Sequence, residues 1–146
     1  MKTIGLIGGM SWESSLEYYR LINEFTKEKL GKKHSAECLM YSVDFAEIEE
    51  MQHNGNWDLL KEKMINYASN LKKGGADFIV ICTNTMHKMA DDIENEIDLP
   101  LLHIADAAAH SIVEKNIDKV ALLGTKFTME RDFYKDRLKK HGIEVI

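Results

Sequence analysis

A thiol followed at once by hydroxyl and amide side chains is the part of this sequence best suited to chemistry. Cys82 ends the apolar run 78–81, and Thr83, Asn84 and Thr85 follow it. The run reads as a buried parallel strand, and in open α/β sheets ligands bind just past the carboxyl ends of strands. A helix that starts near Thr85 would lower the pKa of the thiol, and the thiolate could then act as a nucleophile or a proton-abstracting base. We therefore expect Cys82 to be reactive.

Two segments could hold an anion next to this thiol. The residues 83–85 offer two hydroxyls, an amide and several backbone N–H groups, which can bind a carboxylate. They can also cap the next helix, and the two roles are compatible. The loop Gly8-Gly9-Met10-Ser11 follows another predicted strand and is expected at the same edge of the sheet. It matches neither the dinucleotide fingerprint nor the Walker motif.

The remaining cysteine and the histidines suggest no further reactive centre. Cys38 lies inside a predicted strand, where core packing is its expected role. His87 belongs to the helix after Cys82 and is expected at the surface or behind the residues that touch the ligand. The other histidines have no metal-ligand spacing, so we expect no metal site. These are His34, His53, His103, His110 and His141.

Strands and helices alternate from one end of the sequence to the other, which predicts an α/β fold with a parallel sheet and helices on both faces, a three-layer α/β/α arrangement. In the first helix, Leu16, Tyr19, Ile22 and Phe25 mark one apolar face. The expected strands are 3–8, 37–43, 77–82, 101–103, 119–124 and 143–146. The expected helices are 12–30, 44–52 (a helix or a structured loop), 57–73, 85–96, 104–116 and 128–140.

The sequence contains a faint internal repeat. Residues 4–8 and 120–124 are apolar runs that end in glycine, and each leads into a helix with a tyrosine. The tyrosines are Tyr18 or Tyr19 in the first unit and Tyr134 in the second. Duplication and a mere architectural echo explain this match equally well. If the units are duplicates, the counterpart of Cys82 would lie beyond Ile146.

Composition narrows the class of protein. A chain of 146 residues can form a domain with a sizeable core. The net charge of −5 and the lack of a basic run argue against nucleic acid or an anionic membrane as partner. No apolar stretch is long enough to span a bilayer, and no signal peptide is visible. Two cysteines without a disulfide framework favour a cytoplasmic protein.

Four segments of the sequence resemble the aspartate/glutamate racemase family, and most closely its broad-specificity amino-acid racemase branch. They occur in the family's order and spread over the chain. The matching segments are 5–15 (GLIGGMSWESS), 42–45 (SVDF), 81–88 (ICTNTMHK) and 102–106 (LHIAD).

The resemblance implies a reaction and a set of site residues. Family members interconvert L- and D-amino acids without pyridoxal phosphate or metal, so no cofactor is expected. Two cysteines on opposite faces of the substrate Cα move the proton, and each comes from one of two pseudo-symmetric α/β domains. Cys82 matches the first cysteine. By resemblance, the substrate contacts are Met10, Gln52, Thr83, Asn84 and Thr85.

The resemblance also implies how the chain is divided. Residues 1–116 would form the first racemase domain, and residues 117–146 would begin a second, truncated one. The partner would be a small-molecule amino acid, with no nucleic acid or membrane. Family members often dimerise, so a homodimer is possible.

The sequence departs from the family at one point. The second cysteine, which the family carries in a Gly-Cys-Thr-Glu segment, is absent, and Cys38 cannot replace it because it lies in an early strand of the first domain. We therefore expect little or no racemisation by this chain alone. Two alternatives stay open: a non-catalytic amino-acid-binding half-domain, and a related cysteine-dependent decarboxylase or isomerase of small carboxylic acids. No arginine occurs in 44–48, which weakens strict aspartate specificity.

Overall fold

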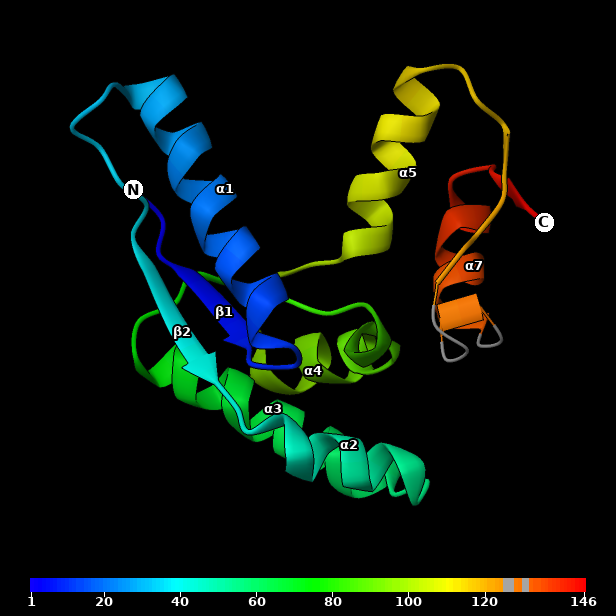
Figure 1. Cartoon of the computed structure of the whole chain (residues 1–146), viewed down its shortest axis with the longest axis horizontal. Helices are drawn as coiled ribbons and strands as arrows, with labels where there is room; N and C mark the ends of the chain where they lie inside the picture. Colours follow the sequence, from blue (N-terminus) through cyan, green and yellow to red (C-terminus); the bar gives the residue numbers. More distant parts are fainter. Residues whose placement is uncertain (125–127, 130–131) are drawn as a thin grey trace.

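A four-stranded parallel sheet organises the N-terminal part of the computed structural model, which describes residues 1–124, 128–129 and 132–146 (Figure 1). The strand order is β2-β1-β3-β4, and all three neighbouring pairs are parallel. The predicted parallel α/β sheet is therefore confirmed. The strands are β1 (Ile4–Gly8), β2 (Cys38–Ser42), β3 (Phe78–Ile81) and β4 (Leu101–Leu102).

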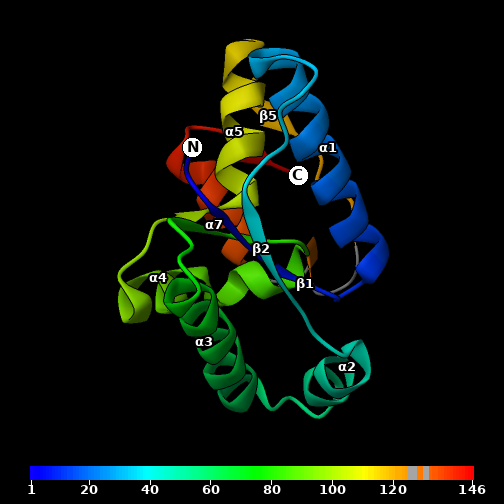
Figure 2. The ribbon, with the colours of Figure 1, turned by 90° about the vertical axis from the view of Figure 1, so that its left-hand side faces the viewer.

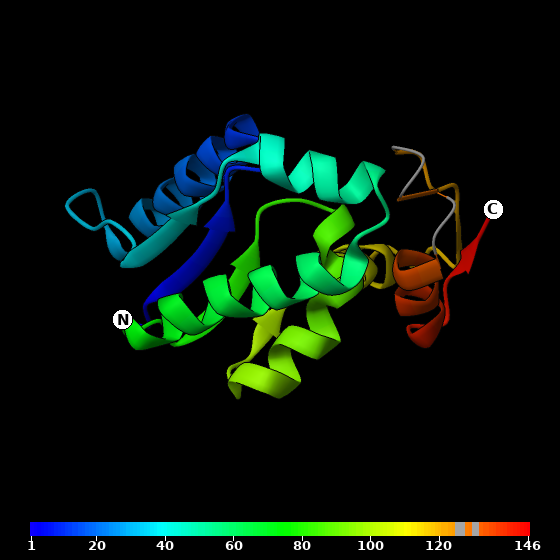
Figure 3. The ribbon, with the colours of Figure 1, turned by 90° about the horizontal axis from the view of Figure 1, so that it is seen from below.

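Helices cover both faces of this sheet, as predicted. Helix α1 (Trp12–Leu30) crosses one face, while α3 (Trp57–Lys73) and α4 (Ala90–Ile97) lie on the other (Figures 1 and 3). Helix α2 (Phe45–His53) connects β2 to α3, with Asp44 accepting a bond from the N–H of Ala46 at its start. The buried residues of α3 are apolar and recur at helical spacing, so they form one face of the helix, which packs against the sheet. They are Leu60, Met64, Ala68 and Leu71.

The opposite face of the sheet is only partly covered. Ser15 is the one buried residue of α1. It lies so close to Gly8 that a Cβ added to Gly8 would collide with the Ser15 hydroxyl. Leu16, Tyr19 and Phe25, expected to form the buried face of this helix, are instead 48–57% exposed. The small residues Gly8 and Ser15 bring α1 close to β1, so the large apolar side chains project past the contact rather than into it.

The C-terminal part forms a separate small unit. Helix α5 (Ile104–Glu114) packs against α7 (Asp132–Lys140), and a second, two-stranded parallel sheet joins β5 (Lys119–Val120) to β6 (Glu144–Val145) (Figure 2). Ala109, Leu138 and Ile143 are the buried centre of this unit. The strand expected over 119–124 is shorter, since regular pairing ends at Val120 and Leu123 is 86% exposed. Part of the helix expected over 128–140 lies outside the described residues.

None of the helices in the described ranges is both long enough and apolar enough to cross a membrane.

Candidate functional site

The carboxyl ends of β1 and β3 meet at the point where the strand order reverses. From β1 the chain goes to β2 on one side and returns to β3 on the other, with α1 and α3 on opposite faces. Ile7 and Ile81 are paired, and the N–H of Cys82 donates to the carbonyl of Ile7 at 2.9 Å. Such reversals leave a crevice beyond the strand ends, where α/β proteins bind ligands. The structure thus places both candidate loops at one edge of the sheet, as expected.

The loop after β1 depends on glycine. Gly9 has a φ of +92°, and a Cβ there would run into the backbone of Val43 at the end of β2. The N–H of Gly9 donates to Ser15 Oγ at 2.9 Å, and Gly8 accepts from the N–H of Val43 at 3.0 Å. The N–H of Gly9 and the carbonyl of Gly8 are thus already bonded within the protein. The N–H of Gly9 therefore gives no support to the expected role of this loop in binding an anion.

Cys82 lies directly at the end of β3 and is only 1% exposed. Its carbonyl accepts a hydrogen bond from Ser14 Oγ of α1 at 2.8 Å, which ties the strand end to that helix. Burial raises the pKa of the Cys82 thiol to about 12. The lowered thiol pKa that we expected from a helix N-terminus is therefore wrong in sign, and the resting group is a protonated thiol.

The local structure after Cys82 explains this difference. The expected helix over 85–96 divides into a 3₁₀ segment, η1 (Thr85–Met89), followed by α4. A single short 3₁₀ segment has few aligned peptide dipoles, so it offers the thiolate little stabilisation against the cost of burial.

A cavity of about 350 Å³ opens immediately beyond Cys82. One wall is the segment Thr83–Thr85, and the other comes from the C-terminal unit. Cys82 itself is not among the lining residues, and none of the lining residues that the structure describes is charged. They are Thr83, Asn84, Thr85, Leu122, Leu123, Gly124, Thr128 and Tyr134.

The side chains of Thr83, Asn84 and Thr85 have no hydrogen-bond partner among the described residues. Their hydroxyl and amide groups are therefore available to a ligand in the cavity. The structure thus brings together three of the five expected substrate contacts, next to Cys82.

The structure does not bring the other two expected contacts to this cavity. Met10 is 4% exposed and belongs to the main hydrophobic core. Gln52 lies near the end of α2 and is partly exposed, and its backbone carbonyl accepts from the N–H of Gly55. Neither is among the residues that line the cavity.

Two tyrosines flank this region and were not selected from the sequence. Tyr134 of α7 lines the cavity, and Tyr18 of α1 lies one helical turn after Ser14, which holds the Cys82 carbonyl. Burial raises the pKa of Tyr18, with Cys82 and Tyr134 as further causes. The signal was present in the internal repeat, which matched these two tyrosines and also Gly124.

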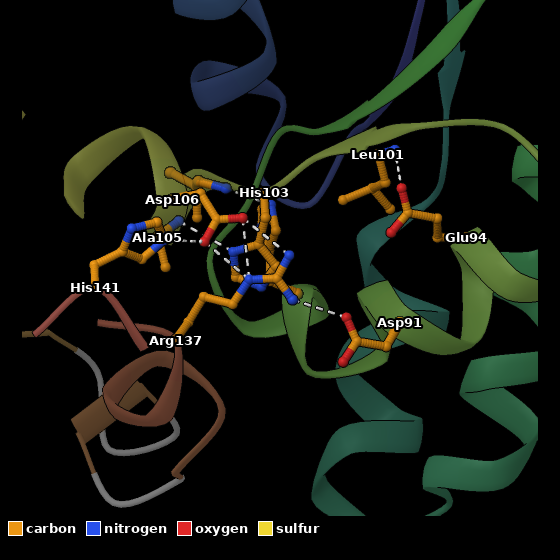
Figure 4. Close-up of polar contacts among 10 residues, drawn as sticks. Asp91, Glu94, Leu101, His103, Ala105, Asp106, Arg137 and His141 are labelled. Atoms are coloured by element: carbon orange, nitrogen blue, oxygen red, sulfur yellow. Dashed lines mark hydrogen bonds and ion pairs between the residues drawn. The ribbon is translucent and has the colours of Figure 1, made fainter. Parts of the chain in front are cut away.

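A cluster of polar side chains joins the elements behind the cavity (Figure 4). Arg137 of α7 donates to Asp106 of α5 at 2.9–3.0 Å and to Asp91 of α4 at 2.8 Å. His141 lies 3.0 Å from the same Asp106 carboxylate. Burial alone would raise the pKa of Asp106, but the hydrogen bonds from Arg137 and His141 hold it at about 2. Asp106 is thus a permanent anion that anchors α7 to α5.

His87, expected at the surface or behind the ligand-contacting residues, is 2% exposed and bonds to the carbonyl of Thr83. It therefore lies behind the segment 83–85, which lines the cavity. No group of three potential metal ligands occurs within residues 1–124, 128–129 and 132–146. Cys38 is partly buried at the start of β2, beside apolar residues of α1.

Comparison with known proteins identifies the family of this site. Residues 7–146 match the family model described as Asp/Glu/hydantoin racemase. The chain is 28% identical over 148 residues to the broad specificity amino-acid racemase RacX of Bacillus subtilis, covering 98% of this chain and 63% of that protein.

Two solved structures share the fold along the whole chain. A Yersinia pestis protein assigned to the Asp/Glu racemases is 58% identical with a TM-score of 0.96, and an aspartate racemase homologue from Pyrococcus horikoshii is 40% identical with a TM-score of 0.89. The alignment covers 100% of this chain but 64% of each of those chains. The protein therefore spans somewhat less than two thirds of these relatives, and it belongs to the Asp/Glu/hydantoin racemase family.

Proposed function

We propose that this chain provides one half of the active site of a cofactor-independent amino-acid racemase. Cys82 would exchange the Cα proton, and the Thr83–Thr85 segment would bind the substrate carboxylate. The observation that carries this proposal is the cavity that begins at the residue after Cys82 and is lined on one side by Thr83, Asn84 and Thr85, whose side chains have no hydrogen-bond partner among the described residues. Neutral donors of this kind suit a carboxylate, and the named relatives include amino-acid racemases.

The chemistry follows from the position of the donors. When a base removes the Cα proton, the Cα–H bond breaks and its electron pair spreads onto the carboxylate oxygens. Hydrogen-bond donors at those oxygens stabilise the developing charge. A second acid on the opposite face then returns a proton to Cα, which inverts the configuration. Because Cys82 rests as a thiol, it would begin the reaction as the proton donor, opposite a base that starts ionised.

Neither cysteine of this chain can supply that opposite base. Cys38 pairs with Ile4 at the amino end of the sheet, whereas Cys82 follows Ile81 at the carboxyl end. Four residues of strand, about 13 Å, separate these two levels. We therefore expect the 146 residues alone to racemise amino acids slowly or not at all.

We also infer that residues 1–116 form the first racemase domain and that residues 117–146 begin the second. Two observations support this division: the sheets are separate, and β5 and β6 contribute to a second buried cluster. Helix α5 lies at the boundary, since its Ala109 belongs to that second cluster.

The uncharged lining of the cavity bears on the substrate. A side-chain carboxylate of aspartate or glutamate is best bound by a guanidinium group, and no arginine or lysine lines the described part of the cavity. The neutral donors of Thr83, Asn84 and Thr85 suit the α-carboxylate that all amino acids share. The proposed reaction assigns both proton transfers to side chains and invokes neither pyridoxal phosphate nor a metal.

A second candidate function is amino-acid binding without catalysis. It is favoured by the burial of Cys82 and by the raised pKa of its thiol, which leaves about one sulfur in ten thousand ionised near pH 8.

Calorimetry and NMR in D₂O separate the two functions. We expect D- and L-glutamate to bind, Cα deuterium exchange to be slow and to retain configuration, and Cys82→Ser to abolish the exchange. Cys38→Ser is the matched control and should change neither readout. Binding without any exchange would establish the second candidate. Rapid racemisation by these 146 residues would contradict the need for another base, and absence of binding would overturn both functions.

A further inference from the structure

His87 is a buried histidine whose two ring nitrogens both have backbone partners. Its Nδ1 lies 2.7 Å from the carbonyl oxygen of Thr83, and its Nε2 lies 3.3 Å from the backbone N of Ile104. The ring is only 2% exposed, so water does not compete for either nitrogen. One ring thus connects the residue after Cys82 to the first residue of α5.

These partners determine the tautomer. The N–H of Ile104 can only donate, so Nε2 must be the unprotonated acceptor. Nδ1 therefore carries the hydrogen and donates to the carbonyl of Thr83. A doubly protonated ring would place two N–H groups face to face at Ile104, so both bonds require the neutral ring.

The charges around the ring favour the same state. The His103 ring lies 4.6 Å away between centroids, and Arg137 of α7 also lies near. Burial, His103 and Arg137 lower the pKa of His87 to about 4, against the opposing effect of the Thr83 bond. The carboxylates of Asp91 and Asp106 are bonded to Arg137 (Figure 4).

His87 also connects the two walls of the cavity. One wall contains Thr83, whose carbonyl the ring holds. The other wall includes Tyr134 of α7, and α7 is bound to α5 through Arg137 and Asp106. Since the ring also bonds the first residue of α5, it links the 83–85 segment to the helix on which α7 is anchored.

We propose that His87 is a positioning residue: its neutral ring, protonated at Nδ1, holds the Thr83 carbonyl against the start of α5 and so aims the donors of the Thr83–Thr85 segment into the cavity. The ligand part of this proposal rests on the proposed function, whereas the tautomer and the loop contact do not.

The first test uses the unmodified chain without ligand. Long-range ¹H–¹⁵N spectra of the labelled protein should show His87 protonated at Nδ1 alone near pH 7, and still neutral near pH 5. An Nε2–H tautomer, or a ring that becomes charged between those values, would overturn the proposal whatever the protein binds.

The second test separates the two bonds with a pair of variants. In His87→Asn the amide nitrogen lies near the Nδ1 position and can still donate to Thr83, whereas in His87→Gln the amide oxygen lies near Nε2 and can still accept from Ile104. We expect His87→Gln to shift the Thr83 carbonyl resonance and broaden the amide signals of 83–85, and to weaken glutamate binding at least tenfold. His87→Asn keeps the Thr83 bond but frees the N–H of Ile104, so it should preserve the Thr83 carbonyl resonance, shift the Ile104 amide signal and weaken binding by less than His87→Gln does.

His53→Asn is the matched control, because His53 Nδ1 also lies 2.8 Å from a carbonyl four residues earlier, but on an exposed helix. It should leave the 83–85 signals and binding unchanged. Equal effects of the Asn and Gln variants on the loop would mean that His87 acts only as core packing, which contradicts the proposal. If the loop responds as expected but no variant binds glutamate, the proposed function fails and the positioning role stands.

Discussion

At the scale of the residue, burial rather than helix polarity sets the acid-base state of Cys82. The thiol lies at the strand end predicted from the sequence, but the 3₁₀ geometry that follows leaves desolvation as the dominant cause of its pKa shift. A protonated thiol beside the segment that we propose to bind the carboxylate is suited to donating a proton. On that proposal, the sulfur would be activated by its substrate or by a neighbouring group.

The ionisation of Cys82 can be measured directly. In a Cys38→Ser chain, where Cys82 is the remaining thiol, the ultraviolet absorbance of the thiolate should appear only near pH 12, because burial raises the pKa to about 12. Modification by a thiol reagent at neutral pH should be correspondingly slow. The Cys82→Ser chain, which keeps the less buried Cys38, is the comparison. A Cys82 titration at or below about 9 would restore the activated thiolate that we expected from the sequence.

Histidine burial makes stability depend on pH. The pKa of His87 falls from 6.5 in the unfolded chain to about 4 in the folded one, so between these values the unfolded state binds more protons. Stability is complete above the unfolded pKa and is lost as the pH falls toward 4. Urea unfolding should show about 2 kcal/mol less stability at pH 5 than at pH 7 from this group.

The control for this measurement is His87→Asn, which removes the titrating ring. His103, whose pKa burial also lowers, is present in both chains, so the difference between them reports His87 together with its coupling to His103. An equal pH dependence in the parent and in the variant would show that His87 does not titrate as described.

At the scale of the element, the turn after β1 requires glycine for two reasons at once. Gly9 has a φ of +92° and no room for a Cβ beside Val43, whereas Gly55 has a φ of +70° with nothing within 4 Å. Gly55→Ala should cost about 1 kcal/mol through backbone strain alone. Gly9→Ala should cost at least about 2 kcal/mol more in urea unfolding, because β1 and β2 must also separate. Equal costs would mean that the loop relaxes freely.

The anchor of α7 gives a second prediction at this scale. Arg137 and Asp106 have 21% and 28% exposed side chains, and Arg137→Gln should destabilise the C-terminal unit by about 1–3 kcal/mol. Arg20→Gln removes the surface pairs with Glu17 and Glu24, whose side chains are 48% (Arg20) and 56% (both glutamates) exposed, and should leave the stability almost unchanged. Amide hydrogen exchange in α7 and β6 would report the difference, and protection retained in Arg137→Gln would contradict the anchoring role.

The sequence predicted the order and type of the elements well because apolar periodicity is a local property. The α3 stripe and the strand before Cys82 are both found where this periodicity placed them. It could not predict that Leu16, Tyr19 and Phe25 stay exposed, since this depends on how closely Gly8 lets α1 approach. The second wall of the cavity was missed for a similar reason: Tyr134 lies beside the 83–85 segment because α7 packs back onto α5 and η1, which is a long-range arrangement.

At the scale of the whole molecule, the main asymmetry is the open face between α1 and α5 (Figure 1). An apolar groove of about 540 Å³ lies there, and its borders include Phe25 and Leu102, which are 57% and 58% exposed. The opposite face is closed by α3 and α4. Burying apolar area of this kind is favourable by about 25 cal/mol per Å², so an exposed groove promotes association.

We therefore expect the purified chain to self-associate as its concentration rises, through this groove. A Phe25→Lys, Leu102→Lys double variant should reduce the association measured by light scattering or sedimentation, because charged groups would have to be buried at the contact. Leu59→Lys is the matched control: Leu59 lies on α3, is 48% exposed and is not among the residues that line the groove, so its replacement should leave association unchanged. A chain that stays monomeric at high concentration would contradict the prediction. Equal effects of the double variant and of Leu59→Lys would place the associating surface outside this groove. The result also bears on the candidate site, because the groove is bordered by Ile81, which precedes Cys82, and by His87, which holds the Thr83 carbonyl.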